Sequence, residues 1–358
     1  MMKKMYVLLI VAAWSLAFIA PVFSKTCMAQ EAFKPVTLKY ADATPQQSWF
    51  GQQHQWWANE VEKRTGGKVK IQMFWMESLV KWKDMLPGVQ SGIADLGWIS
   101  STYHPSNLPL YLMLDNPFAF RKDYFAAFLA LIDTTDNEPN LKAEMERESI
   151  ILICPHISGQ MQIGSKKPLN SAKDLKGKTI RTYGGGRGKY LESFGLNPIF
   201  MSYSDIYEAL DRGTIDAAEM VMMLSQTFKH YEVTKYLYMT NAGGALASGI
   251  YMNRKVFNKF PKDIQETLIK LRLEYSERYA KGTQDLEVGF YREWETKHGI
   301  KIVYPSPEDQ KALQEAGQKA TDSILKKQES EGHKGARKVW DYYMTALKKY
   351  EDQRAGKK

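Results

Sequence analysis

One arginine stands where a folded chain commonly binds small molecules. Arg181 lies near the end of a strand-like run, Lys178 to Tyr183, just before the turn Gly184-Gly-Gly186. Open α/β folds bind ligands at the carboxyl ends of their strands. A guanidinium at such an edge needs an anionic partner, and its planar fork matches a carboxylate through two parallel hydrogen bonds. The residues alone leave two partners open: the carboxylate of a ligand, or an internal salt bridge to Asp174 or Glu219.

Motifs for catalysis and for phosphate binding are missing from the sequence. The six histidines form no HExxH pair, and no GxSxG motif is present. The glycine turn after Arg181 has neither the GxGxxG spacing nor the Gly-Lys-Ser/Thr tail of a phosphate loop. We therefore predict a protein that is not an enzyme and that holds no cofactor.

Composition indicates an ordinary globular chain. Of the 358 residues, 44% are hydrophobic and 25% are charged, which excludes a disordered or polytopic membrane protein. The net charge of +9 comes from basic residues spread along the chain, so we expect no nucleic-acid partner. The length suits about two domains of ~150 residues each.

The N-terminus is typical of an exported protein. Lys3 and Lys4 precede an apolar run from Tyr6 to Phe23, and small residues follow it, which predicts a cleaved secretory signal over 1–29. The alternative is an uncleaved membrane anchor, because about 18 apolar residues can just span a bilayer. After cleavage Cys154 is the only cysteine, so the mature chain can form no internal disulfide.

The chain repeats one pattern of short strands and helices. In the first half we expect strands at Val36 to Ala41, Lys68 to Trp75 and Ala94 to Ser100, with helices at Ser48 to Thr65 and Trp82 to Ser91. In the second half we expect strands at Lys178 to Tyr183 and Asp216 to Met222, with a helix at Ser204 to Arg212 capped by Ser204. In both halves a glycine, Gly92 or Gly213, ends the helix and an aspartate follows three residues later. Two α/β lobes of similar build are therefore predicted.

The last third of the chain is almost wholly helical. Pro261 to Lys297 predicts one helical stretch of roughly 54 Å, which exceeds the diameter of one lobe, so it is either broken or crosses between lobes. A short strand at Lys301 to Val303 and helices at Pro307 to Glu331 and Ala336 to Tyr350 complete the chain. No long Gly/Ser or Pro linker divides the two lobes, which favours a hinge.

Seven short motifs connect these elements to a known family. They are Glu62-Lys-Arg-Thr-Gly-Gly67, Gly88-Val-Gln-Ser-Gly-Ile-Ala-Asp95, Asn116-Pro-Phe118, Asp174-Leu-Lys-Gly-Lys-Thr-Ile-Arg181, Asp205-Ile-Tyr-Glu-Ala-Leu210, Gly213-Thr-Ile-Asp216 and Pro261-Lys-Asp-Ile-Gln265. In this order, from about residue 36 to 330, the sequence resembles the DctP-type extracytoplasmic solute receptors of tripartite ATP-independent periplasmic (TRAP) transporters. The resemblance implies a two-lobed α/β fold like that of periplasmic binding proteins, with a central cleft and a long helix spanning both lobes.

The resemblance also implies a location, partners and domain limits. We expect a periplasmic monomer that passes a small organic acid to TRAP membrane subunits. The expected divisions are a signal peptide at 1–29, lobe I at 30–157 plus about 246–288, lobe II at 158–245 plus about 289–330, and a C-terminal helix at 331–358.

Differences from the family pattern suggest the type of ligand. By resemblance, Arg181 binds the ligand's carboxylate. Met161 stands where many relatives have a second arginine, and Met220 where many have an amide. Thioethers suit apolar or aromatic surfaces, so we expect an apolar or aromatic monocarboxylate. The alternative is that both methionines are simply core residues.

Further site residues are expected by resemblance. Trp98, Ser100 and Tyr203 match positions that line the pocket in relatives, and Trp75 is a further candidate. Some relatives bind 2-oxo acids through a cation, and Glu219 would then be the first candidate ligand. Three alternatives thus remain open: such a cation-assisted receptor, a sensor of the same fold that signals to a membrane kinase, and a periplasmic enzyme on this scaffold.

Overall fold

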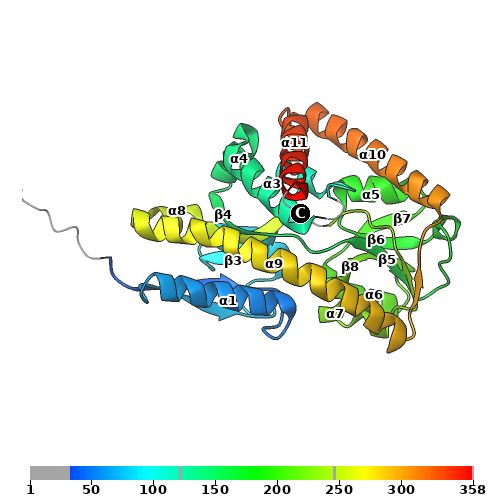
Figure 1. Ribbon diagram of the computed structural model, residues 1–358, viewed down its shortest axis with the longest axis horizontal. Coiled ribbons are helices and arrows are strands. Elements are labelled where there is room, and N and C mark those ends of the chain that lie inside the picture. Colours follow the sequence, from blue (N-terminus) through cyan, green and yellow to red (C-terminus); the bar gives the residue numbers. More distant parts are fainter. Residues whose placement is uncertain (1–32, 121–122, 245–246, 357–358) are drawn as a thin grey trace, which may run out of the picture. The chain divides into compact units, whose positions relative to one another are not determined.

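A computed structural model describes residues 33–120, 123–244 and 247–356 (Figure 1). The predicted signal peptide lies outside the described residues. Within the described ranges, no helix combines the length and the apolar character needed to cross a membrane. Residues 34–358 form one structural unit with two β-sheets, and we call the parts that carry them lobe I and lobe II.

The sheet of lobe I has five strands in the order β2-β1-β3-β10-β4. Their bounds are Val69–Phe74 (β2), Val36–Ala41 (β1), Leu96–Ser100 (β3), Ser248–Asn253 (β10) and Ile150–His156 (β4). Strand β1 is parallel to β2 and β3, while β10 is antiparallel to both β3 and β4. The carboxyl ends of β1 to β4 therefore meet at one edge of this sheet.

The sheet of lobe II has six strands in the order β11-β9-β5-β8-β6-β7. Their bounds are Lys301–Val303 (β11), Tyr236–Tyr238 (β9), Met161–Ser165 (β5), Ala217–Val221 (β8), Thr179–Thr182 (β6) and Asn197–Phe200 (β7). Strand β6 is parallel to β7 and β8, and β5 is antiparallel to β8. The chain crosses between the sheets at 157–160 and again between the end of β9 and the start of β10, so the carboxyl edges of both sheets lie at the crossings.

Short helices cover the two sheets. Their bounds are Trp49–Arg64 (α1), Met85–Gln90 (α2), Tyr124–Asn137 (α3), Pro139–Arg147 (α4), Gly185–Glu192 (α5), Ile206–Asp211 (α6), Met222–Thr227 (α7) and Arg254–Asn258 (α8). Helix α1 begins as expected, since the Ser48 hydroxyl accepts a hydrogen bond from the Gly51 N–H at 3.0 Å. Gly92 and Gly213 follow their helices with φ of 79° and 73°, which confirms that they end them.

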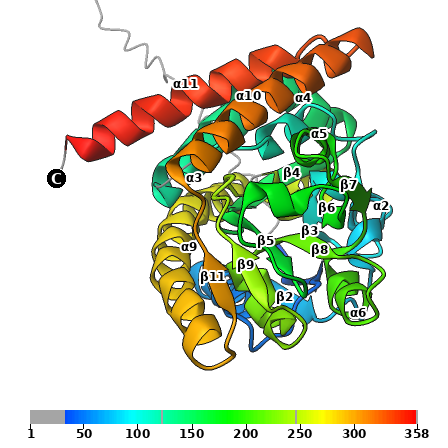
Figure 2. The same cartoon turned by 90° about the vertical axis from the view of Figure 1, so that its right-hand side faces the viewer.

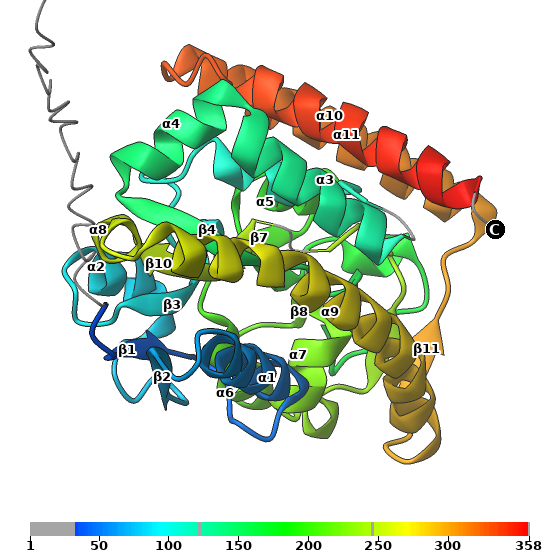
Figure 3. The ribbon, with the colours of Figure 1, turned by 60° about the vertical axis from the view of Figure 1, so that its left-hand side comes forward.

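One long helix connects the lobes. Helix α9 (Lys262–Thr296) is continuous over 35 residues. It packs on α1, α3 and β4 in lobe I and on α7 and β11 in lobe II, as Figures 1 and 3 show. The prediction of a long helix that crosses from one lobe to the other is therefore confirmed, and the alternative of a broken helix is wrong.

The last two helices cover different lobes. Helix α10 (Pro307–Ser330) packs on α5 in lobe II, and α11 (Ala336–Ala355) packs on α3 in lobe I. The two helices are also in contact with each other, and Figure 2 shows them side by side. Helix α11 continues five residues beyond the predicted end at Tyr350.

The predicted N-cap at Ser204 is wrong. Residues Tyr203–Asp205 form a tight 3-10 turn, and α6 begins only at Ile206. The Ser204 hydroxyl lies 3.0 Å from the hydroxyl of Ser202 and caps no helix. The turn is shifted because the Tyr203 side chain is anchored in the core, which the local pattern of polar residues does not reveal.

Candidate functional site

Arg181 lies on β6, near the carboxyl edge of the lobe II sheet, and is wholly buried. Its Nε donates to the carbonyl oxygen of Met201 and its Nη1 to that of Glu219, both at 3.1 Å. Among the described residues Nη2 has no hydrogen-bond partner. The N–H donors of Nη2 are therefore available to a group from outside the described protein.

Neither internal salt bridge considered for Arg181 is formed. The Asp174 carboxylate accepts hydrogen bonds from the backbone N–H groups of Asn170 and Ser171. The Glu219 carboxylate instead pairs with Arg187, at 3.2 Å. A buried guanidinium without a carboxylate is costly, and an anionic ligand would remove that cost.

Two tyrosine rings pack against the Arg181 guanidinium. Its Cζ lies 3.9 Å from the centroid of Tyr183 and 5.0 Å from that of Tyr203. The Tyr203 hydroxyl is fixed by Ser225 at 2.8 Å, whereas that of Tyr183 has no partner among the described residues. Burial raises the pKa of Tyr183 well above its usual value, although the Arg181 charge opposes this rise. Tyr183 therefore offers a neutral hydroxyl beside the free guanidinium donors.

A histidine stacks behind Tyr203, and no motif in the sequence points to it. The rings of His230 and Tyr203 are 5.3 Å apart. Burial, helped by the charge of Arg181, lowers the pKa of His230 to about 3. The imidazole is therefore neutral at physiological pH and adds no positive charge to the site.

The two lobes touch directly beside this arginine. The Tyr203 N–H of lobe II donates a hydrogen bond to the hydroxyl of Tyr103 in lobe I, at 3.1 Å. The Tyr103 ring also packs on Phe200 of β7, with centroids 5.9 Å apart. We expected the site residues to line an open cleft; the structure buries them instead, because the lobes are in contact here. Sequence reasoning missed Tyr103, since its role depends on a contact between residues 100 positions apart.

Aromatic rings continue from this contact into lobe I. Tyr103 packs on Trp82 at 5.6 Å, and Trp82 packs on Trp98 at 4.7 Å. Trp98 is 1% exposed, and its indole N–H has no partner among the described residues. Ser100, two residues further on β3, lies 2.8 Å from the Thr102 hydroxyl. The structure thus places Trp98 and Ser100 at the edge of lobe I that faces the Arg181 site.

The remaining aromatic candidate lies apart from these rings. Trp75 follows β2, the edge strand of the lobe I sheet, and is half-buried. Strand β1 separates β2 from β3, which carries Trp98. The structure therefore does not bring Trp75 together with the other candidates.

The two methionines lie on opposite faces of the lobe II sheet. In the register of β5 and β8, Met161 pairs with Val221, and Met220 pairs with Gln162. Met220 packs so tightly on Gly164 that a Cβ there would lie 2.7 Å from the Met220 sulfur. The structure does not bring the two thioethers together into one wall, and the packing of Met220 is that of a core residue.

Comparisons with known proteins identify the family. Residues 40–328 match the family model "Bacterial extracellular solute-binding protein, family 7", DctP. The chain belongs to this family. A solute-binding protein of Verminephrobacter eiseniae is 30% identical over 260 residues, which cover 70% of this chain and 76% of the relative.

Solved structures of TRAP solute-binding proteins share the fold. One from Desulfovibrio salexigens is 28% identical, with a TM-score of 0.72. The match covers 88% of this chain and 97% of the Desulfovibrio protein. Another, from an unidentified marine microbe, is specific for aromatic acids and is bound to 3-hydroxybenzoate. It is 20% identical, with a TM-score of 0.79, and the match covers 88% of this chain and 99% of the marine protein. The chain is thus a DctP-type TRAP receptor with a two-lobed α/β fold, and its family consists of solute-binding proteins rather than enzymes.

Glu219 of the receptor is engaged in internal contacts. One carboxylate oxygen pairs with Arg187, and the other accepts a hydrogen bond from the Thr182 hydroxyl at 3.0 Å. Within the described ranges, no group of three or more His, Cys, Asp or Glu side chains is arranged to hold a metal ion. The alternative in which Glu219 binds a cation therefore finds no support in this geometry.

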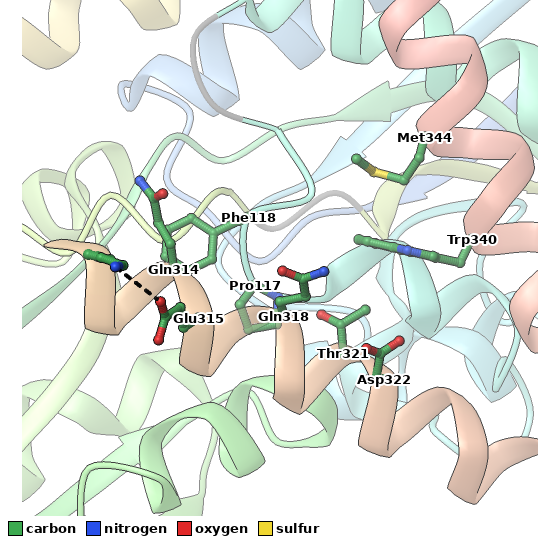
Figure 4. A pocket seen from close by; sticks show the side chains of 10 residues that line it. Pro117, Phe118, Gln314, Glu315, Gln318, Thr321, Asp322, Trp340 and Met344 are labelled. Atoms are coloured by element: carbon green, nitrogen blue, oxygen red, sulfur yellow. Dashed lines mark ion pairs between the residues drawn. The ribbon is translucent and has the colours of Figure 1, made fainter.

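A separate pocket lies between the last two helices of the receptor. It has a volume of about 470 Å³ and is lined by residues of α10, α11 and the Pro117-Phe118 loop. Figure 4 shows Trp340 and Met344 reaching into it from α11. On α10, Lys311 and Glu315 form an ion pair at 3.9 Å. None of the candidate residues from the sequence lines this pocket, so it is distinct from the Arg181 site.

Proposed function

We propose that the receptor binds a small organic monocarboxylate with an apolar or aromatic body and presents it to the membrane subunits of a TRAP transporter. The observation that carries this proposal is the environment of Arg181. The guanidinium is wholly buried, lacks a carboxylate partner among the described residues and keeps Nη2 free. A ligand carboxylate would satisfy both its charge and its remaining donors.

Charge at the site favours one carboxylate over two. The other buried arginine close by, Arg187, is already paired with Glu219. A second carboxylate would thus be buried without a cation of its own, which costs at least ~1–3 kcal/mol. This supports a monocarboxylate over a C4-dicarboxylate.

Aromatic side chains on both lobes favour a flat or apolar ligand body. Tyr183 and Tyr203 of lobe II pack on Arg181, and Tyr103 of lobe I, which accepts the Tyr203 N–H, packs on Trp82. Such rings pack well on an aromatic acid. The relative that is bound to 3-hydroxybenzoate has the same fold, which supports this choice of ligand.

The lobe contact supports a role in delivery. Tyr103 and Tyr203 meet only when the lobes are together, so a ligand held between them would stabilise the closed form. A membrane partner that recognises the closed form would then receive only loaded receptor. We assign this partner to the TRAP membrane subunits.

Calorimetry on ligand-free protein tests the proposal. Benzoate and 3-hydroxybenzoate should bind more tightly than succinate, and Arg181→Gln should weaken their binding by at least ~30-fold, since two charge-assisted bonds are lost. Arg181→Lys should rescue little, because an ammonium cannot form the two parallel bonds. Arg212→Gln, at an exposed arginine paired with Glu208, is the matched control. Binding of the acids to Arg181→Gln within about threefold of the wild type, or a preference for succinate, would overturn the assignment.

A further inference from the structure

Two arginines cap carbonyl oxygens of β4, an edge strand of the lobe I sheet. Arg254 of α8 donates a hydrogen bond from Nη2 to the carbonyl oxygen of Ile150, at 2.9 Å. Arg272 of α9 donates from Nη2 to the carbonyl oxygen of Leu152, at 2.6 Å. The two carbonyl groups are two residues apart, which is roughly 7 Å along a strand. Both guanidinium groups are therefore fixed on one strand, and the carboxylate site in lobe II uses neither of them.

Only one of these arginines has a carboxylate partner. Arg272 Nη1 lies 2.8 and 2.7 Å from the two carboxylate oxygens of Asp136. Arg254 forms no ion pair within the described ranges, and its Nε is buried without a hydrogen-bond partner there. Partial burial lowers the pKa of Arg254, and the opposing carboxylate of Glu146 acts on it from beyond ion-pair distance. A partly buried guanidinium without a counter-charge is costly, so an external anion at Arg254 would be stabilising.

A cavity of about 270 Å³ lies beside both arginines, between α3, α4, β4, α8 and α9. Lys142 of α4 also lines it. The Lys142 side chain is exposed and, among the described residues, forms neither an ion pair nor a hydrogen bond. The apolar residues that line the cavity are Met145, Ile151, Leu152 and Ile269. Two cations without counter-ions thus line a small cavity with apolar walls.

The pair of Arg272 with Asp136 indicates which anion fits at Arg254. Both arginines are anchored to β4 in the same way, so a carboxylate at Arg254 would repeat a contact that the chain already makes at Arg272. Arg254 has donors left for it, because Nη1 forms no hydrogen bond with the described residues. The cavity is smaller than a usual pocket for a drug-sized ligand, which limits the molecule to a few carbon atoms. Its apolar walls suit a short hydrocarbon body.

We propose that this cavity is an accessory binding site for a small carboxylate with a short apolar body, which Arg254 binds through hydrogen bonds and Lys142 attracts by its charge. The bound acid would connect α4 with α8 beside β4 and thereby stabilise lobe I. Arg181 lies in the other lobe, so occupation of this cavity needs no ligand at Arg181.

NMR signals from the cavity itself report binding in the wild-type protein. With ¹⁵N-arginine and ¹³C-methyl isoleucine labels, added isobutyrate should shift the Arg254 Nε signal and the methyl signals of Ile151 and Ile269 until they saturate. Isobutyramide has nearly the same shape without the charge, so it should cause no comparable shift. Inorganic phosphate should bind at least roughly threefold more weakly, because it buries no hydrocarbon. Sodium chloride at the same ionic strength controls for screening. Binding of an acid at Arg181 does not move these local signals.

Variants assign the binding to the two cations. Followed by the isoleucine methyl signals, Arg254→Gln should weaken the binding of isobutyrate at least roughly tenfold, and Lys142→Gln roughly two- to fivefold. Lys270→Gln and Arg212→Gln, at exposed cations outside the cavity, should bind it as the wild type does. If Arg254→Gln fails to fold, Lys142→Gln against Lys270→Gln decides, since both side chains are exposed.

Three results would overturn the inference. The first is an equal effect of isobutyrate and of isobutyramide or sodium chloride on the cavity signals, which would show that no carboxylate binds. The second is binding of inorganic phosphate as tight as that of isobutyrate, which would show a general anion site. The third is wild-type affinity for isobutyrate in folded Arg254→Gln, or in Lys142→Gln.

Discussion

Arg187 Nη1 lies 3.2 Å from Oε1 of Glu219, and both side chains are at most 2% exposed. Arg187 Nη2 also donates to the carbonyl oxygen of Gly244, at 2.8 Å, in the segment that crosses back to lobe I. This pair ties α5 and β8 to the crossing segment. It also explains why Arg181 has no carboxylate partner, since the nearest candidate is already used.

Breaking this buried pair should destabilise the receptor strongly. Arg187→Met leaves the Glu219 carboxylate buried without a cation, and we expect a loss of about 3–5 kcal/mol in the free energy of unfolding. Urea titration measures this loss. The double variant Arg187→Met/Glu219→Leu should lose less than the sum of the two single variants, because neither charge remains. As a control, Arg212→Met, which breaks the exposed pair with Glu208, should cost less than about 1 kcal/mol. A loss below about 1 kcal/mol for Arg187→Met would contradict this account.

Tyr103→Phe should weaken ligand binding without unfolding the protein. It removes only the hydroxyl that accepts the Tyr203 N–H, a bond made between the lobes. Because a neutral hydrogen bond contributes about 0.5–1.5 kcal/mol, the ratio of closed to open molecules should fall by roughly 2- to 12-fold. Calorimetry and small-angle scattering with saturating benzoate measure the affinity and the closure. Tyr304→Phe, at a residue 70% exposed, is the control. If affinity and radius of gyration match the wild type, the contact does not control closure.

Local patterns in the sequence were enough to predict most of the fold. The helix 262–296 follows from its apolar spacing, and the ends of two helices follow from Gly92 and Gly213, because these signals act within a few residues. The N-cap at Ser204 was wrong, since the anchored side chain of Tyr203 outweighs the local capping signal.

The site was only partly predictable. Arg181 and Tyr203 were found through the family pattern, and the structure places them together. Whether Met161 and Met220 share a face depends on the register of β5 and β8, which the sequence does not give. Tyr103 was missed because its partner, Tyr203, lies 100 residues away. Long-range pairings of this kind leave no periodic signal.

Two buried histidines should make the receptor less stable from about pH 6.5 downwards. Burial lowers the pKa of His104 to about 4 and that of His230 to about 3. The unfolded chain, with histidine pKa values near ~6.5, therefore binds protons first, so the contribution of these two histidines to stability is full above about pH 6.5 and falls as the pH drops towards about 4. Urea titrations at about pH 7.5, 6 and 4.5 should show this slope. His104→Gln should reduce the slope of the unfolding free energy with pH, whereas His333→Gln should leave it unchanged. Equal slopes in both variants would show that His104 does not cause the pH dependence.

Two glycine substitutions in helices should have opposite effects on stability. At Gly317 in α10, a Cβ would lie 2.4 Å from the Phe118 ring, whereas at Gly289 in α9 it would meet nothing within 4 Å. Phe118 cannot yield easily, because it has a φ of 60° and its N–H donates to the Ala242 carbonyl at 2.8 Å. Gly317→Ala should therefore lose about 1–3 kcal/mol of unfolding free energy, while Gly289→Ala should gain about 0.5–1 kcal/mol from helix propensity. Urea titration of both variants provides the comparison. If Gly317→Ala is as stable as Gly289→Ala, α10 is not held against the Phe118 ring as the structure shows.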